Sequence, residues 1–233
     1  MRKIVTAVFI AAFFAFPFQV MAGNVTGSIS FSGTAPAPEE IKMNADATCA
    51  GAHSGTVTSQ DVIVNSNNTL KNVFVYVKTG LEGKTFETPK TPVALDQKGC
   101  MYEPHVFGAM VNQEIEIVNS DSTLHNVHAM PTAQKEFNLG MPIKGMKLKK
   151  KFATSEVMVK FKCDVHPWMH AYIGVLPHPF FAVSGDDGSF TIKDLPAGTY
   201  TIEAWHEKYG TQTQEITVAE GEAPAVNFTF NAA

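Results

Sequence analysis

Residues 161–169 read Phe-Lys-Cys-Asp-Val-His-Pro-Trp-Met, and they place Cys163, His166 and Met169 in one short stretch. Just upstream, Val157, Val159 and Phe161 alternate with Met158, Lys160 and Lys162. This alternation has the period of a half-buried strand that ends at Cys163. A second apolar run follows at residues 171–175. The pattern therefore predicts that the three side chains share one loop between two strands.

A fourth side chain of the same chemical kind, His125, lies 38 residues before Cys163. Residues 113–118 read as a strand, and the polar break at residues 119–123 leads to His125 at the start of the next strand. One thiolate, two imidazoles and a weak thioether form the ligand set of a blue-copper electron-transfer site. A lone buried Cys or Met usually only fills a core, but the coincidence of all four favours copper.

The spacing Cys-x-x-His-x-x-Met, with Pro167 and an aromatic residue before the Met, resembles the copper-binding loop of the cupredoxins, amicyanin and plastocyanin above all. The segment His125-Asn-Val-His128 resembles their upstream ligand segment, and the likeness covers roughly residues 90–178. The resemblance implies one type 1 copper with three equatorial ligands, one axial ligand and one residue that joins the two ligand segments by hydrogen bonds. By this resemblance the equatorial ligands are His125, Cys163 and His166, the axial ligand is Met169, and Asn126 joins the two segments. Asp164 and Val165 depart from the family pattern, and Asp164 either lowers the reduction potential or faces water.

The other histidines give a weaker signal, because no second thiolate accompanies them. His128, His170 and His178 are expected to lie on the surface or to line a core, and His128 is not expected to be a ligand. A second metal site that involves His105, His128 or His206 stays open.

Two further cysteines, Cys49 and Cys100, remain if Cys163 holds copper. In an exported protein they are expected to form a disulfide. The alternative is that one of them binds a second metal together with His53 or His105.

The sequence on either side of this region also reads as short strands. Asp186-Asp-Gly188 and Pro196-Ala-Gly198 mark turns between alternating segments after residue 180. This part resembles the second half of a carboxypeptidase regulatory-like, or transthyretin-like, sandwich. The opening strands of such a domain resemble residues 27–31 and 70–77, which precede the copper region.

We therefore predict an all-β chain: a cupredoxin Greek-key sandwich plus a smaller, prealbumin-like sandwich that is discontinuous. The predicted divisions are a signal peptide at 1–22, the first part of the smaller sandwich at 23–87, the cupredoxin domain at 88–178 and the second part at 179–233. Two consecutive domains are the alternative arrangement.

Residues 1–22 begin with Arg2 and Lys3, continue with an apolar run and end in a small-residue cleavage pattern. The run is too short for a membrane span, so the chain is expected in the periplasm. The formal net charge of −4 argues against nucleic acid.

The expected function is electron transfer without substrate turnover, and the alternative is a copper-handling or copper-sensing accessory protein. The expected partner is a transient redox protein, a dehydrogenase or a cytochrome c type, while the oligomeric state stays open. The redox partner is expected to contact a partly exposed edge of the His166 ring, which a collar of apolar residues surrounds. The collar residues are Met130, Pro131, Met141, Pro142, Pro167 and Trp168. Seven lysines between residues 144 and 162 form either a docking patch or a solvated hairpin.

Overall fold

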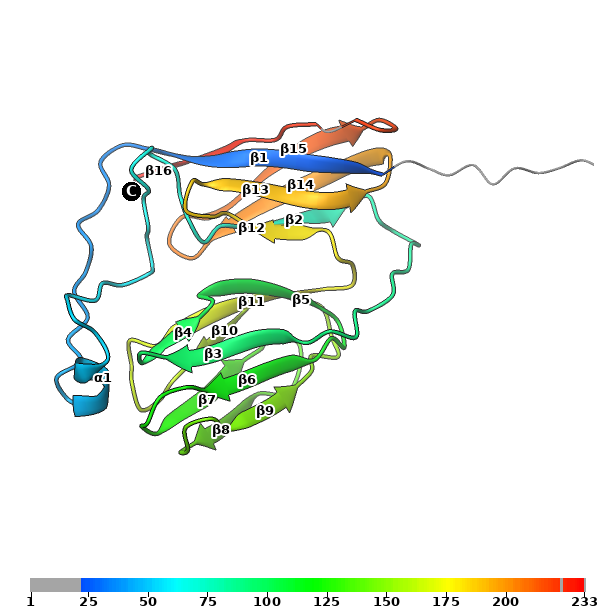
Figure 1. The fold of residues 1–233 in the computed structure, drawn as a ribbon. Coiled ribbons are helices and arrows are strands. Elements are labelled where there is room, and N and C mark those ends of the chain that lie inside the picture. The colour runs from blue at the N-terminus through cyan, green and yellow to red at the C-terminus, as the bar shows by residue number, and fades with distance from the viewer. Residues whose placement is uncertain (1–21, 223, 233) are drawn as a thin grey trace, which may run out of the picture.

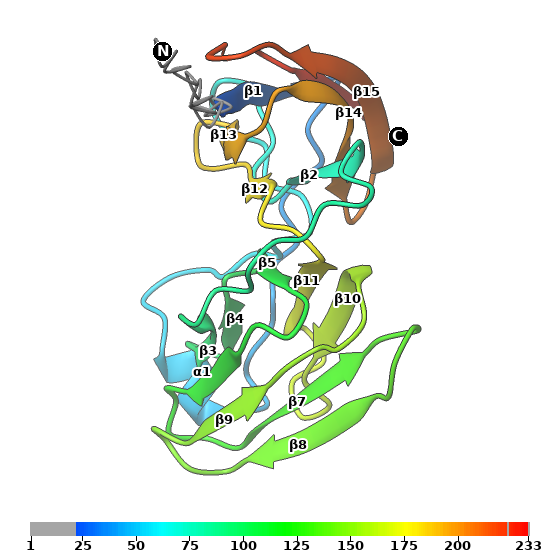
Figure 2. The same ribbon diagram turned by 90° about the vertical axis from the view of Figure 1, so that its right-hand side faces the viewer.

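The computed structural model describes residues 22–222 and 224–232, and these form two β-sandwiches stacked one on the other (Figures 1 and 2). Apart from the five-residue helix α1 (Ala47–Gly51), the regular structure in these residues consists of strands. The predicted all-β fold class is confirmed. Of the predicted signal peptide at residues 1–22, all but Ala22 lies outside the described residues. Within the described part of the chain, no helix is long and apolar enough to cross a membrane.

The first sandwich, here called the inserted module, is built from a continuous run of strands in the middle of the chain. Its strands are β3 (Val93–Lys98), β4 (Met101–Glu103), β5 (Val106–Met110), β6 (Ile115–Asn119), β7 (His125–Met130), β8 (Phe137–Met141), β9 (Lys147–Lys150), β10 (Glu156–Lys162) and β11 (His170–Leu176). They form one sheet in the order β5-β11-β10-β7-β8 and a second in the order β4-β3-β6-β9. The apolar faces of both sheets enclose one core.

The alternation that predicts β10 holds only over its second half. Val159 and Phe161 are buried as expected, but Val157 is 37% exposed. Met158 has a φ of 62°, and the pairing of β10 with β11 shifts register between Glu156 and Val159. A bulge of this kind moves the preceding residue to the other face of the strand. The inward orientation expected for Val157 was therefore wrong.

The second sandwich, here called the outer sandwich, combines strands from both ends of the chain. Its strands are β1 (Gly23–Ser32), β2 (Phe74–Thr79), β12 (Phe181–Val183), β13 (Ser189–Leu195), β14 (Gly198–His206), β15 (Gly210–Val218) and β16 (Phe228–Asn231). The strand β1 lies between β13 and β16, and β2 lies between β12 and β14. The pairing that a nested sandwich requires is thus present, whereas the exact boundaries at 87/88 and 178/179 stay predictions.

Two glycines set the contact between the sandwiches. Gly108 of β5 and Gly174 of β11 are register partners in parallel strands. A Cβ atom on Gly108 would lie 2.3 Å from the Phe181 ring, and one on Gly174 would lie 2.3 Å from the Phe74 ring. Only glycine leaves room for rings at this distance. Phe74 and Phe181 stack on each other and anchor β2 and β12 to the inserted module.

The long connection between β1 and β2 does not stay with the outer sandwich. In Figure 1 it descends to the side of the inserted module, where it carries α1. Met43 and Cys49 are buried in the core of the inserted module, and the predicted disulfide between Cys49 and Cys100 is formed. We call residues 43–52 the cap. Although this segment was expected to belong to the outer sandwich, it is packed against the other core because the disulfide holds it there.

Candidate metal centre

The loop between β10 and β11 brings three of the predicted ligands together. The N–H of Cys163 donates to the carbonyl of Met169 at 3.0 Å, and the N–H of Met169 donates to the carbonyl of His166 at 2.9 Å. These bonds close the loop into a tight turn. Cys163, His166 and Met169 are all buried. These bonds fix the backbone positions from which the three side chains project.

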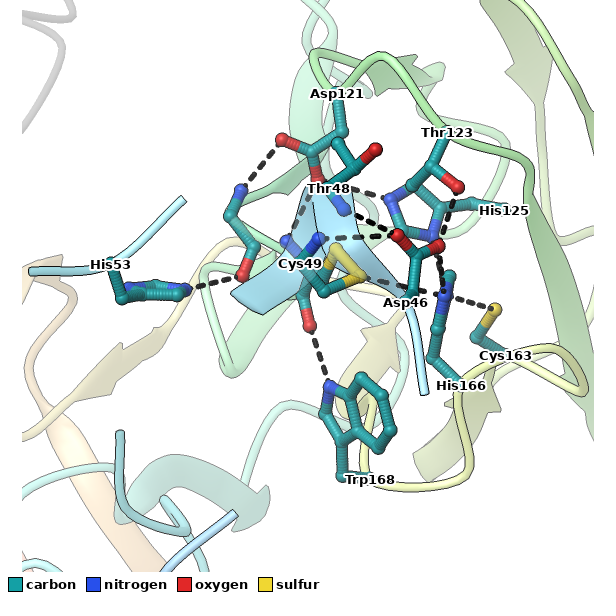
Figure 3. Close-up of a disulfide and its surroundings, with 12 residues drawn as sticks. Asp46, Thr48, Cys49, His53, Asp121, Thr123, His125, Cys163, His166 and Trp168 are labelled. Carbon is teal, nitrogen blue, oxygen red and sulfur yellow. Dashed lines mark hydrogen bonds and ion pairs between the residues drawn. A yellow bond between two sulfur atoms is a disulfide. The ribbon is translucent and has the colours of Figure 1, made fainter. Parts of the chain in front are cut away.

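His125 reaches the same place from β7, which pairs with β10 in the same sheet. The Nδ1 atoms of His125 and His166 lie 3.0 Å apart, and Sγ of Cys163 lies 3.8 Å from Nδ1 of His166. These three donors lie within 4.8 Å of one another (Figure 3). Ligand bonds of about 2.0 Å for nitrogen and about 2.3 Å for sulfur place donors about 3 to 3.8 Å apart when they share one ion. The donor set therefore fits a single metal ion.

A carboxylate lies on the far side of each imidazole. Oδ2 of Asp121 is 3.0 Å from Nε2 of His125, and Oδ2 of Asp46 is 3.1 Å from Nε2 of His166. A metal-binding histidine commonly donates its other ring N–H to such a carboxylate, which leaves the first nitrogen free for the metal. Both carboxylates thus favour the tautomer with the proton on Nε2, in which the lone pair of Nδ1 is free for a metal ion. Neither was expected from the sequence.

Hydrogen bonds hold both carboxylates in place. Asp121 accepts from the backbone N–H groups of Gly99 and Cys100, each at 2.8 Å. Asp46 is the N-cap of α1, where it accepts from the N–H of Thr48 and Cys49, and it also accepts from Thr123 Oγ1 at 2.7 Å. The bond to Thr123 and those to Cys49, His166 and Thr48 outweigh desolvation and hold the pKa of Asp46 far below its usual value. Asp46 is therefore a fixed negative charge.

The Cys163 thiol lies among donors that favour its thiolate form. Burial alone would raise its pKa, but hydrogen bonds from the His125 side chain and from the backbone N–H groups of Asn126, His166 and Val165 lower it. Burial alone would lower the pKa of His125, but Asp121 and Cys163 raise it to about 9. For His166 burial and the charge of His125 prevail over Asp46 and lower the pKa. A metal ion would displace the proton that His125 otherwise holds.

Asn126 joins the two ligand segments. Its Oδ1 accepts from the N–H of Asp164 at 2.6 Å and from Sγ of Cys163 at 3.3 Å. Its Nδ2 donates to Asn138 and to Asp164. Asp164 in turn contacts His128 and Lys162. The carboxylate that departs from the family pattern is thus tied into this network and does not simply face water.

The cap covers the face of His166 where an open edge was expected. The His166 side chain is only 3% exposed, because Asp46 and the disulfide lie over Nε2, with Cys49 Sγ 3.5 Å away (Figure 3). The expectation of a partly exposed imidazole edge was therefore wrong. Within the expected collar, Met141 is fully buried, while Met130 is exposed. The N-cap Asp46 three residues before Cys49 was the available signal, but the sequence did not show where it would dock.

The remaining histidines have varied surroundings. His128 lies near the surface, with its ring nitrogens 3.0 Å from Asp164 and 2.7 Å from Glu136. His178 is buried and lies 3.0 Å from the carbonyl of Val77, and His53 lies 2.7 Å from the carbonyl of Gly99. His170 instead lies beside two carboxylates at the junction of the sandwiches. Lysines of the 144–162 run also have partners, since Lys147 pairs with Glu116 and Lys149 with Glu114.

Residues 171–231 match the family model of the carboxypeptidase regulatory-like domain. The matched range contains β12 to β16, so it represents the C-terminal contribution to the outer sandwich, together with β11 of the inserted module. No curated protein matches the chain.

Solved cupredoxin structures are similar to part of the chain. A purple cupredoxin from Nitrosopumilus maritimus is 20% identical, with 36% of this chain and 98% of that chain covered and a TM-score of 0.31. An amicyanin variant in its Cu(I) form is 20% identical, with 42% and 96% covered and a TM-score of 0.33. A copper-containing nitrite reductase from Thermus scotoductus SA-01 is 19% identical over 42% of this chain, with a TM-score of 0.35. The matched region spans only 25% of the reductase.

Proposed function

We propose that this chain is an exported, periplasmic electron-transfer protein with one type 1 copper. His125, Cys163 and His166 would be the equatorial ligands and Met169 the axial ligand. The convergence of two Nδ1 atoms and one Sγ, with both Nε2 atoms directed at carboxylates, carries the proposal. Copper in such a site supplies one-electron exchange between Cu(I) and Cu(II).

The chain's own contribution would be to hold the ligands still. His125 and Cys163 are buried at the ends of strands that share a sheet, and Asn126 bonds to both sides of the site. A ligand set held by packing and hydrogen bonds resists rearrangement when the charge at its centre changes. Met169 would fill the axial place, so we propose no substrate turnover at this site.

The electron would leave through Trp168 rather than through the His166 edge. The two ring centroids lie 5.1 Å apart, and the indole N–H donates to the carbonyl of Cys100 at 2.9 Å. Trp168 is half-buried and lines a surface groove with Pro167 and Ile41. A transient redox partner with a small contact area would dock over this groove.

Titration of the purified, metal-free protein with Cu(II) tests the proposal. We expect one equivalent to bind and to give the intense visible band of a thiolate–copper bond. Cys163→Ser and His125→Asn should lose that band. His128→Asn is the matched control, because it removes an imidazole three residues from His125 and should keep the band. A band that persists in Cys163→Ser, or a colourless copper complex of the native protein, would refute the assignment.

The burial of His166 gives specific support to a second candidate, a copper-handling protein. A covered ligand slows electron exchange with a partner, and a protein that only transfers copper does not need that exchange to be fast. Stopped-flow reduction by an inorganic complex and competition for Cu(I) with a chelator would separate the two functions. Fast reduction with slow copper loss favours the carrier. Slow reduction with ready transfer of Cu(I) to the chelator favours handling.

A further inference from the structure

A second group of metal-binding side chains lies at the junction of the two sandwiches. His105 precedes β5 and His170 begins β11, both in the inserted module, whereas Glu207 follows β14 of the outer sandwich. Nε2 of His105 is 2.5 Å from Oε1 of Glu207, and Nε2 of His170 is 3.2 Å from Oε2 of Glu207. One donor atom from each residue lies within 4.8 Å of the other two. Asp61 adds a fourth donor, with Oδ1 3.2 Å from Nε2 of His170.

The orientation of His170 points to a cation between these groups. Its Nδ1 lies 3.2 Å from the carbonyl of Trp168, to which only a ring N–H can donate. In the neutral ring that bond leaves a lone pair on Nε2, which faces the carboxylates of Glu207 and Asp61. A lone pair directed at two carboxylates is repelled unless a proton or a metal ion lies between them. A backbone carbonyl on the far nitrogen is also the usual arrangement for a metal-binding histidine.

Burial and access agree with a metal site. The side chains of His105 and Glu207 are 3% and 6% exposed, so the Glu207 carboxylate needs a counter-charge. Lys208 pairs with Asp61 at 2.7 Å and balances that second carboxylate. A groove of about 330 Å³ opens onto His170 and Asp61, and its walls carry Glu39 and Glu40 against one cation, Lys42. An acidic groove of this kind offers a route for a cation.

We propose that His105, His170 and Glu207, with Asp61, bind a divalent zinc ion. Two imidazoles and a carboxylate with a fourth oxygen suit the tetrahedral N/O coordination of zinc. The ion would link the inserted module to the outer sandwich, because Glu207 and Asp61 come from outside the module. The zinc proposal does not rest on the proposed copper function, since the two sites share no ligand, although both lie beside the groove lined by Trp168 and His170.

The test measures zinc binding in the full chain with Cys163→Ser, which removes the thiolate of the copper site. After equilibrium dialysis against Zn²⁺, metal analysis should give one zinc per chain. Glu207→Gln and His105→Gln should each lower the affinity at least tenfold. The matched controls are Glu203→Gln, which removes a buried carboxylate of β14, and His178→Gln, which removes another buried imidazole. Both controls should bind zinc as the parent does.

X-ray absorption at the zinc edge gives a second reading that does not depend on the variants folding. In native protein already loaded with one copper, the zinc should have only nitrogen and oxygen neighbours, including two imidazoles. Sulfur in the first shell would mean that zinc occupies the Cys163 site and would overturn the proposal. So would the absence of zinc binding, since the cluster would then be a hydrogen-bonded network only. Unaltered affinity in folded Glu207→Gln would also overturn it.

Discussion

Oδ2 of Asp46 lies 3.1 Å from Nε2 of His166, while the Nδ1 of the same ring faces Cys163. The carboxylate comes from the N-cap of α1, far from the ligand loop in sequence. One imidazole thus joins the candidate copper site to a segment that precedes it by more than a hundred residues. The cap therefore acts both as a cover and as a source of negative charge.

We expect Asp46→Asn to raise the reduction potential of the copper-loaded protein. A negative charge beside a ligand stabilises Cu(II) over Cu(I), and its removal weakens that preference. The side chain is 20% exposed, so solvent screening reduces the effect to about 60 mV, the one-electron equivalent of about 1.4 kcal/mol. Redox titration of the visible band measures it. Asp187→Asn, in an exposed turn, is the control, and an unchanged potential in Asp46→Asn would count against the charge argument.

Trp168→Leu should slow electron exchange without a loss of copper. The indole lies next to the His166 ring and reaches the surface groove, so its removal lengthens the path through the protein. Stopped-flow oxidation by an inorganic complex should show a rate at least several-fold lower. Trp205→Leu, which removes the other indole of the chain beside Tyr172, should leave the rate unchanged. Equal rates in the Trp168 variant and the native protein would exclude this route.

Replacement of both Cys49 and Cys100 by alanine should lower stability and release the cap. The disulfide closes a loop of 51 residues, and in the chain-entropy model its loss costs about 4 kcal/mol. Urea unfolding followed by fluorescence measures this cost. The variant should also lose copper faster to a chelator, because Asp46 no longer covers His166. A copper-loss rate equal to that of the native protein would show that the cap holds without its covalent link.

Met169→Leu should keep the visible band and raise the reduction potential. The thiolate remains in place, so the colour persists, whereas loss of the axial thioether disfavours Cu(II) more than Cu(I). Met158→Leu, at the bulge of β10, is the control. A fall in potential would remove Met169 from the ligand set.

His178 should contribute to the dependence of stability on pH. Burial lowers its pKa below the ordinary value of 6.5, so the unfolded chain binds a proton more readily than the folded one. The contribution of neutral His178 to the free energy of unfolding is therefore complete above about pH 6.5. It is lost as the pH falls from there through the lower pKa that His178 has in the folded protein. Urea midpoints between pH 4 and 8 should show a shallower slope for His178→Gln than for the native chain. Identical slopes would show that His178 does not contribute.

The parts of the molecule that could be predicted from sequence are those that depend on residues a few positions apart along the chain. Cys163, His166 and Met169 lie within one loop, so their proximity follows from the strand pattern alone. The cap over His166, the glycine pair Gly108 and Gly174, and the bulge at Met158 depend on contacts between distant segments or on backbone conformation. A sequence without tertiary contacts does not specify these, and the expected open edge of His166 failed for that reason.

The insertion of one sandwich into another also orders the events of folding. The first strand, β1, bridges to Thr69 through Ser30, but its strand partners β13 and β16 are synthesised after the whole inserted module. The module draws its strands from one continuous stretch, and its folding brings together the flanking strands β2 and β12. That closes in advance most of the loop that the outer sandwich would otherwise have to close at an entropic cost. The inserted module is thus expected to serve as the template on which the outer sandwich assembles.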